Sequence, residues 1–313
     1  ERAFMFSQWS RVGFHRNDSR IIIRGEVLSG GKLWDKSKNT NVWKFSAYQL
    51  SDSNIKKIVD KINEIKPAFF HVYPTSMQIF TQLMKDHKLL LNFSPKAILC
   101  GSEKLYDHQR KLFKDFFGCR VFSWLGLAEQ TVLAGECEYS EKLHIFSEHS
   151  YVELIDDHNN VIQDPGISGE IVGTRLHRYI IPFIRYRSGD IASYASGPCE
   201  CKRNYKLLEN VEGRVQDVVL TKQGKKIPVT ALFFGQHLKV FERALKIQLV
   251  QQVAGHVTVN IIRGKNYSYE DEVQLLDKLK IATISDITFR LNYVDQIETT
   301  KRGKHKHLIS EIN

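Results

Sequence analysis

Apolar residues follow two alternating patterns in the first part of the chain, up to about Trp124. Helical spacing of apolar positions predicts helices over 54–66, 74–85 and 105–117. Pro67 stops the first helix, and Gly118 follows the third in the usual C-cap position. Continuous apolar runs predict buried strands, over 68–72, 94–100 and 120–124. Because strands and helices alternate, this part predicts a parallel sheet in a large α/β domain.

The pattern changes from about residue 143. Short apolar stretches joined by turns predict strands over 152–155, 169–174 and 191–194. They indicate an antiparallel, barrel-like β subdomain. The polar segment 212–217 precedes a new apolar pattern, so we expect one domain over 1–213, a hinge at 214–217 and a small α+β domain over 218–313. Its expected helices are 230–243 and 269–280, and its expected strands are 246–251, 256–263 and 287–293.

Composition and charge narrow the class of protein. The chain has 313 residues, 42% of them hydrophobic, which is enough for a sizeable core and argues against disorder. It has no apolar run long enough to cross a membrane and does not start like a signal peptide, so we expect a soluble, cytoplasmic protein. The net charge of +10 and the basic run at 301–307 suggest a nucleic-acid binder, but no recognition motif accompanies them. We therefore expect no nucleic-acid partner.

The five cysteines fall into two groups. Cys100 and Cys119 lie in or beside apolar runs and are interpreted as core thiols. The remaining three join one histidine in two clusters that match a structural zinc site: Cys137, His144, Cys199 and Cys201. His149 is the weaker candidate for the histidine ligand. The alternative is three unrelated thiols and a surface histidine, although a Cys-x-Cys pair under reducing conditions favours a metal over a disulfide.

Several short motifs lie after predicted strands, at the domain boundary or near the C-terminus: Gly101-Ser102-Glu103, Leu125-Gly126-Leu127-Ala128-Glu129, 185–190, 213–217 and 300–304. Their order resembles the AMP-binding, adenylate-forming superfamily. His71-Val72-Tyr73-Pro74-Thr75-Ser76 and the Cys/His pattern narrow the resemblance to the phenylacetate–CoA ligase branch, with its relatives in capsular polysaccharide biosynthesis. The resemblance implies that 1–213 is an AMP-binding core and that the C-terminal domain is a mobile lid.

The resemblance also implies roles for individual residues. Those expected to contact ATP or AMP are Gly101, Ser102, Glu103, Leu125, Gly126, Ala128, Asp190 and Arg214. Glu129 would help to hold Mg²⁺ on the phosphates, and Asp190 would accept hydrogen bonds from the ribose. Lys304 would neutralise charge in the transition state of adenylation. The alternatives are a turn aspartate for Asp190 and a solvated tail lysine for Lys304.

Some positions depart from the family pattern. Leu125 stands where the family has tyrosine, Ala128 replaces a small hydroxyl residue, and Gln216 replaces the usual hinge aspartate. No Ser/Thr/Gly-rich phosphate loop occurs in residues 1–30, so we expect the chain to begin just downstream of that loop. Either the loop lies in sequence that precedes Glu1, or ATP turnover has been lost.

Two functions follow from the resemblance. The first is an AMP-forming acid–thiol ligase, which activates a small carboxylic acid with ATP and transfers the acyl group to CoA or an amine. Residues near His71, Tyr73 and Pro74 would line its acyl pocket. The second is a non-catalytic module of a polysaccharide or secondary-metabolite pathway. A homodimer is compatible with the sequence, which does not set the oligomeric state.

Overall fold

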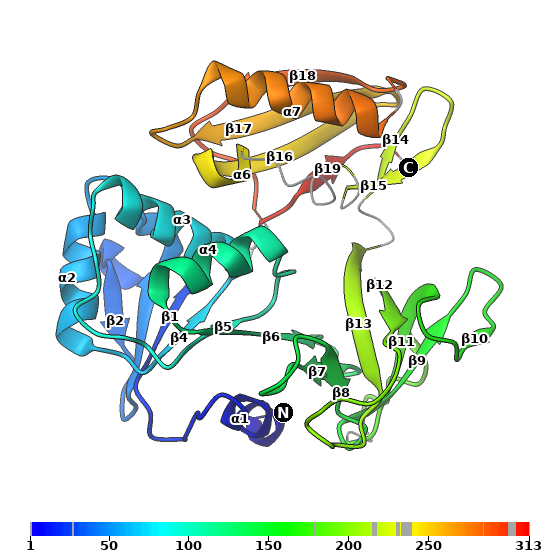
Figure 1. Cartoon of the computed structure of the whole chain (residues 1–313), viewed down its shortest axis with the longest axis horizontal. Helices are drawn as coiled ribbons and strands as arrows, with labels where there is room; N and C mark the ends of the chain where they lie inside the picture. Colours follow the sequence, from blue (N-terminus) through cyan, green and yellow to red (C-terminus); the bar gives the residue numbers. More distant parts are fainter. Residues whose placement is uncertain are drawn as a thin grey trace.

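The computed structural model describes residues 2–26, 28–177, 180–214, 218–229, 232, 240–283, 285–299 and 305–312. Figure 1 shows an α/β layer, a β-rich subdomain beside it and a C-terminal domain that lies over the helices of the α/β layer. The strands of the α/β layer are β1 (Arg20–Arg24), β2 (Trp34–Lys36), β3 (Val42–Ser46), β4 (Phe69–Val72), β5 (Ala97–Cys100) and β6 (Arg120–Gly126). Its helices are α1 (Arg2–Ser10), α2 (Ile55–Ile65), α3 (Pro74–Asp86) and α4 (Asp107–Phe117), with 3₁₀ turns at Ser29–Gly31 and Ala47–Gln49.

The alternation predicted a parallel sheet, and the strand pairing confirms it. β1 pairs in parallel with β3 and β4, and β4, β5 and β6 continue the parallel order. β2 is an antiparallel edge strand. β5 begins at Ala97, later than the predicted residue 94, because the segment with Pro95 precedes the ladder. Gly118 ends α4 in the left-handed conformation, with φ of 62°, as the sequence predicted.

Both faces of the parallel sheet are covered, which explains its continuous apolar strands. Ile98 and Cys100 of β5 face the core that α2, α3 and α4 close, whereas Ala97 and Leu99 face the opposite core beneath α1. Figure 1 shows α1 on the far side of the sheet from these three helices. Burial raises the pKa of the Cys100 thiol, as expected for a core cysteine.

β6 joins the parallel sheet to the antiparallel subdomain. Its first part, from Arg120 to Ser123, pairs in parallel with β5, and its last part, from Trp124 to Gly126, pairs antiparallel with β7. The subdomain consists of β7 (Leu133–Gly135), β8 (Leu143–Ile145), β9 (Ser150–Ile155), β10 (Val161–Ile162), β11 (Ser168–Arg175), β12 (Tyr186–Tyr194) and β13 (Leu207–Arg214). Its strands are antiparallel as predicted.

The described strands form one 13-stranded sheet, β10-β9-β11-β12-β13-β8-β7-β6-β5-β4-β1-β3-β2, which has two ends. Because β6 pairs with both β5 and β7, the antiparallel strands continue the parallel sheet. A closed barrel is therefore excluded among the described strands, and the barrel-like form that we expected would have to be open.

The C-terminal domain is a small α+β unit. Its strands and helices are β14 (Val218–Leu220), β15 (Lys226–Pro228), α6 (Val240–Arg243), β16 (Ala244–Val253), β17 (His256–Arg263), α7 (Tyr269–Ala282), β18 (Thr288–Tyr293) and β19 (Leu308–Ser310). The order of its four-stranded sheet is β18-β17-β16-β19, and α7 packs Leu275 and Leu279 onto it. Of the predicted helix 230–243, only Leu232 and Val240–Arg243 are described. Residues 215–217 of the predicted hinge lie outside the described residues, so the pivot stays a prediction.

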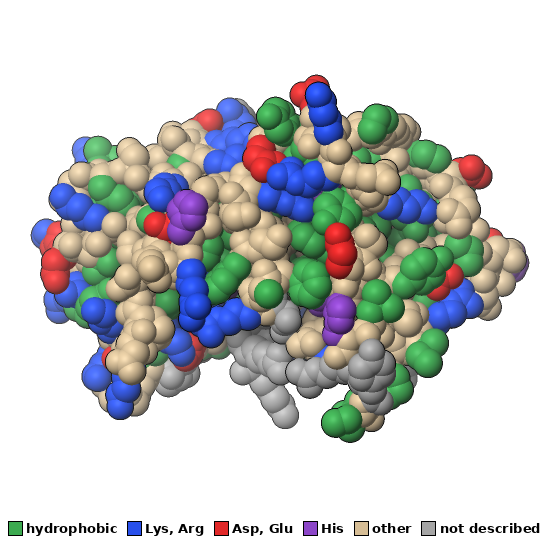
Figure 2. All heavy atoms as spheres, turned by 90° about the horizontal axis from the view of Figure 1, so that it is seen from below, with side chains coloured by type: hydrophobic (Ala, Val, Ile, Leu, Met, Phe, Trp, Pro, Cys, Tyr) green, Lys and Arg blue, Asp and Glu red, His purple; other side chains and the backbone are tan. Residues whose placement is uncertain are grey.

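The described part of the chain also bears on the expected partners. None of its helices has both the length and the apolar character that a membrane span requires. In Figure 2, Lys and Arg side chains on the underside of the molecule are spread out and interleaved with other types.

Candidate active site and metal centre

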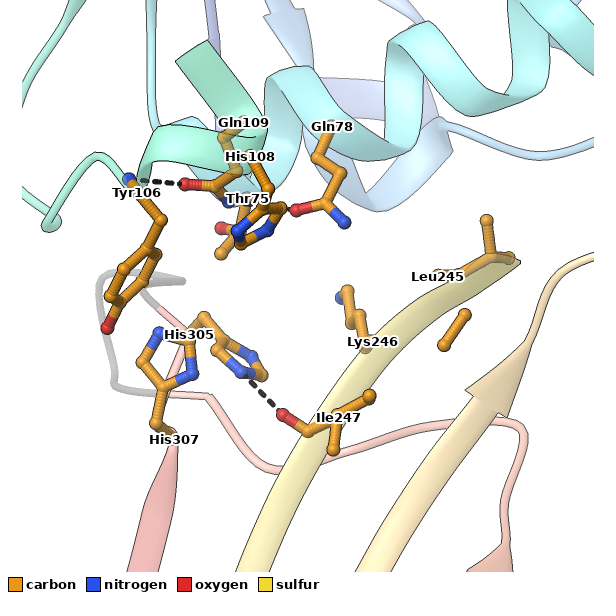
Figure 3. A pocket seen from close by; sticks show the side chains of 11 residues that line it. Thr75, Gln78, Tyr106, His108, Gln109, Leu245, Lys246, Ile247, His305 and His307 are labelled. Carbon is orange, nitrogen blue, oxygen red and sulfur yellow. Dashed lines mark hydrogen bonds between the residues drawn. The ribbon is translucent and has the colours of Figure 1, made fainter. Parts of the chain in front are cut away.

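A narrow cleft lies between the α/β layer and the C-terminal domain (Figure 3). Its volume is about 30 Å³, and it is lined by residues from α3, α4, β16 and the C-terminal segment: Thr75, Gln78, Tyr106, His108, Gln109, Ala244, Leu245, Lys246, Ile247, His305 and His307. This space suits one or two water molecules, whereas ligand pockets measure roughly 300–1,000 Å³. In this arrangement the cleft is a contact between domains and is too small for a nucleotide.

Glu103 connects the two domains beside this cleft. One carboxylate oxygen, Oε2, accepts hydrogen bonds from the backbone N–H of Thr75 at 3.0 Å and from its hydroxyl at 2.7 Å. The other, Oε1, accepts a hydrogen bond from the backbone N–H of His305 at 3.1 Å. Glu103 and His305 lie 202 positions apart in the chain. The Gly101-Ser102-Glu103 motif thus touches the residue that directly follows Lys304.

Gly101 packs against the indole ring of Trp124. A Cβ atom at this position would lie 2.2 Å from Cζ2 of Trp124, so glycine is required for the indole ring to pack against the backbone. Trp124 therefore fills the space that a side chain at this position would take. Ser102, which follows, is exposed and has φ of 68°. A backbone contact from this motif to a nucleotide stays a prediction.

The loop after β6 carries the next group of predicted residues. Leu125 packs at the edge of the antiparallel core, and Gly126 and Ala128 are exposed. Glu129 is half-buried, and its Oε1 accepts a hydrogen bond from the Tyr186 hydroxyl at 3.3 Å. This bond ties Glu129 to β12, the strand that also carries Asp190.

Asp190 and Arg214 are brought together by strand pairing. They are register partners on β12 and β13, and Asp190 is only 8% exposed. The side chain of Arg214 and the whole of Lys304 lie outside the described residues. Thr299 and His305, which flank the segment with Lys304, form an isolated antiparallel bridge. The convergence of Glu129, Asp190, Arg214 and Lys304 on one nucleotide remains a prediction.

The histidines of the basic C-terminal run are packed rather than solvated. The rings of His305 and His307 lie 4.3 Å apart, and His307 contacts Tyr106 edge-on at 5.8 Å. Burial lowers the pKa of His305 well below its ordinary value, with further contributions from His307 and Lys246. Burial, with His108 and Lys104, lowers the pKa of His307 to about 4. In the sequence, the two histidines among the lysines were the one signal that could have indicated this packing.

We expect acidification to weaken this contact. Because His305 and His307 are neutral when folded but bind protons near pH 6.5 when exposed, the exposed state takes up more protons as the pH falls from 6.5 towards 4. Each histidine should cost about 1 kcal/mol of stability per pH unit in that window. Urea unfolding between pH 7.5 and pH 4.5 measures the effect. His307→Gln should flatten the slope and exposed His15→Gln should not; equal slopes in all three proteins would contradict this assignment.

The predicted metal ligands form one cluster. Cys137, His144, Cys199 and Cys201 each direct a ligand atom to a common point, and these atoms all lie within 4.8 Å of one another. Sγ of Cys137 lies 3.6 Å from Sγ of Cys199, and Nε2 of His144 lies 3.2 Å from Sγ of Cys201. Sulfur ligands of a tetrahedral zinc ion are separated by about 3.8 Å, given Zn–S bonds of about 2.3 Å. The donor set and its spacing therefore fit zinc.

The surroundings of the cluster prepare the ligands for a cation. Nδ1 of His144 lies 3.2 Å from the carbonyl oxygen of Lys142, so Nδ1–H donates there and leaves the Nε2 lone pair directed to the cluster. Burial opposes the Cys201 thiolate, but hydrogen bonds from Arg203 and the neighbouring thiols outweigh it and lower the pKa of Cys201. His149, the weaker candidate, contacts the Ser150 hydroxyl at 3.2 Å instead.

The chain is similar in sequence to one domain family and to several known proteins. The CapK C-terminal domain model matches residues 219–311. CapK of Staphylococcus aureus is 23% identical over 308 residues, which cover 96% of this chain and 66% of CapK. Phenylacetate-coenzyme A ligase of Pseudomonas putida is 25% identical over 293 residues, covering 84% of this chain and 62% of the ligase. The chain thus spans slightly less than two thirds of the length of these relatives.

Solved structures agree with this fold. 2-Hydroxyisobutyryl-CoA ligase in the postadenylation state, in complex with R3-HIB-AMP, superposes with a TM-score of 0.74 at 17% identity, over 97% of this chain and 68% of the ligase. The same ligase in the thioesterification state gives a TM-score of 0.55. The chain is therefore similar to CapK and to the phenylacetate-coenzyme A ligases over most of its length, and it has the fold of the adenylate-forming CoA ligases.

Proposed function

We propose that the protein activates a carboxylic acid with ATP, forming an acyl-adenylate and pyrophosphate, and then transfers the acyl group to CoA or an amine. The observation that carries the proposal is the hydrogen bond between Glu103 and His305. It brings the motif at 101–103 next to the motif at 300–304, although the two bonded residues lie 202 positions apart in the chain. CapK and the phenylacetate-coenzyme A ligases as relatives support the reaction class.

Each predicted residue has a distinct role in this proposal. The Asp190 carboxylate accepts hydrogen bonds from the ribose hydroxyls, and Arg214 on the paired strand lies beside the ribose and the phosphate. Glu129 supplies an oxygen ligand to Mg²⁺, which when bound neutralises phosphate charge. Lys304 neutralises the charge that develops between the carboxylate and the α-phosphate. No covalent enzyme intermediate is needed, because alignment and charge account for the catalysis.

The acyl group would bind near His71, and the side chains there favour an apolar or aromatic acid. The ring of His71 lies between Trp9 at 5.1 Å and Trp124 at 5.5 Å. Burial lowers the pKa of His71 to about 3, with Arg20 and Arg24 acting in the same direction, so the imidazole is neutral at pH 7. Because Trp9 and Trp124 flank the neutral imidazole, an aromatic ring would pack there favourably, and the guanidinium of Arg20 over the Trp9 ring supplies a positive charge nearby.

A non-catalytic module is the second candidate. The packing of Trp124 against Gly101 favours it, because a side chain occupies the space next to this nucleotide motif. Leu125 and Ala128, which replace an aromatic and a hydroxyl residue of the family pattern, point the same way. A module of this kind would serve a polysaccharide or secondary-metabolite pathway without turning over ATP.

Pyrophosphate release by the native full-length gene product separates the two candidates. The protein is incubated with ATP, Mg²⁺ and a panel of aliphatic and aromatic acids, with hydroxylamine to trap activated acyl groups. Release that depends on one class of acid, together with its hydroxamate, supports the ligase. No release with any acid, while AMP still binds, supports the non-catalytic module.

The ribose contact gives a separate prediction. We expect Asp190→Ala to weaken AMP binding by roughly 10- to 100-fold, because hydrogen bonds to a charged acceptor contribute about 1.5–3 kcal/mol. Isothermal titration calorimetry measures the change. Asp164→Asn, on an exposed turn, is the matched control and should bind like the unmodified protein. Equal affinity of the Asp190 variant would remove Asp190 from the site.

We also propose that Cys137, His144, Cys199 and Cys201 hold a structural zinc ion. Four protein ligands leave no open position for a catalytic water, which distinguishes this site from catalytic zinc sites. The ion would join the segments after β7 and around β8 to the connection between β12 and β13. It would therefore stabilise the antiparallel subdomain without taking part in the reaction.

A further inference from the structure

The carboxylate of Glu103 is fixed on the N-terminal side of the domain contact. Its Oε2 atom accepts from the N–H and the hydroxyl of Thr75 in the first turn of α3. The N-cap residue of α3, Tyr73, has no side-chain cap of its own, so Glu103 satisfies a helix N–H that would otherwise lack an intrahelical partner. The positive end of the helix dipole also favours a carboxylate there. Glu103 is therefore held in one orientation before the C-terminal domain docks.

The partner of Glu103 is equally well fixed within its own domain. The imidazole of His305 is buried, and its Nε2–H donates to the carbonyl oxygen of Ile247 on β16 at 2.9 Å. The bridge to Thr299 holds the backbone of His305 from the other side. Only the backbone N–H of His305 is directed to Glu103. That N–H belongs to the peptide group that joins His305 to Lys304, so its position constrains the chain next to the lysine.

We propose that Glu103 is a positioning residue that locks the Lys304 segment of the C-terminal domain against the nucleotide-binding motif during adenylation. This inference rests on the proposed function and assigns Glu103 a task distinct from nucleotide contact. One carboxylate anchors α3 with one oxygen and the docked domain with the other, so the lock engages only when the domain is in this orientation. Rotation of the domain for acyl transfer breaks the charge-assisted hydrogen bond between Glu103 and His305.

The surrounding charges and contacts agree with a reversible lock. Burial lowers the pKa of Lys246 on β16, and the charge of Glu103 opposes that shift, so the two groups attract across the contact. A second polar link, from Asn266 to Asp86 at 3.3 Å, joins the domains at the other end of α3. The C-terminal domain thus docks at both ends of α3 through polar contacts, beside the aromatic contact of His307 with Tyr106.

The test compares the two half-reactions in the native full-length protein. Glu103→Ala should slow single-turnover pyrophosphate release by at least about 10-fold, a loss typical of a displaced catalytic group. Thioester formation from a supplied acyl-adenylate and the affinity for AMP should stay within about twofold, because neither uses the lock. Asp107→Asn, an exposed acid at the start of α4, should behave like the unmodified protein. Equal losses in both half-reactions, or a large loss of AMP affinity, would make Glu103 a nucleotide ligand and overturn the proposal.

A second measurement does not depend on activity. Small-angle X-ray scattering at pH 7.5 should show a larger radius of gyration for Glu103→Ala than for the unmodified protein, since the lock no longer holds the domain. Glu103→Gln, which retains the acceptor oxygen without the charge, should lie between them. If the unmodified protein releases no pyrophosphate, the proposed function fails while the scattering still decides the lock. An identical radius of gyration for all three proteins would contradict the proposed lock.

Discussion

Lys304→Ala is expected to slow acyl-adenylate formation by roughly 100- to 1,000-fold, because the lysine ammonium stabilises charge that exists mainly in the transition state. Transfer from a preformed acyl-adenylate should be nearly unchanged, since this step does not need that charge. Single-turnover assays of each half-reaction with the native full-length protein measure the two effects separately. Lys304 lies outside the described residues, so the prediction rests on the Gly303-Lys304 pair and on the contact that its neighbour His305 makes with Glu103.

Lys306 provides the matched control for this variant. Its Nζ atom pairs with Oε1 of Glu298 at 2.5 Å, so its charge is engaged by an acid of its own domain. Lys306→Ala should therefore leave both half-reactions within about twofold of the unmodified protein, as is usual for surface ion pairs. If Lys304→Ala lowers both half-reactions equally, Lys304 is structural. If it lowers neither, Lys304 is a solvated tail residue and the non-catalytic module gains support.

Removal of the metal is expected to have the largest effect on stability. Protein purified without added metal should contain about one zinc per chain, and a strong chelator should lower the free energy of unfolding by several kcal/mol, because structural zinc contributes directly to folding. Cys199→Ser should produce a similar loss and lower the zinc content. The physical reason is that the ion would cross-link Cys137 to Cys199, 62 positions away, and His144 to Cys201, 57 positions away.

Cys119→Ser controls for the loss of a thiol elsewhere. Cys119 packs at the edge of the α/β core, and burial raises its pKa to about 12. Its thiol is therefore protonated at neutral pH and unreactive. This variant should keep its zinc and its response to the chelator. A protein without metal, or one whose unfolding ignores the chelator, would show that the four side chains are an ordinary thiol and histidine cluster. Acid should also release the metal, since His144 and the thiolates must lose protons to bind it.

The sequence by itself determined those features that depend on local spacing. The helix over Ile55–Ile65 follows from the spacing of its apolar residues, of which α2 buries Ile55, Ile58, Val59 and Ile62. The C-cap at Gly118 follows from the conformational freedom of glycine. The grouping of Cys137, His144, Cys199 and Cys201 was also predictable, because few residue types bind a metal and they occurred in two short clusters.

Only the tertiary structure decided how distant segments meet. The strand β6 joins two sheets because its two parts pair with different partners, a choice that its own apolar pattern does not contain. Trp124 fills the space beside Gly101, so the glycine serves packing where the motif alone suggested a ligand. Glu103 meets His305 from 202 positions away, and this contact depends on the docking of one folded domain on another. Local patterns fix which elements form, but contacts between domains depend on the shapes and charges of complete surfaces, which no short stretch of sequence carries.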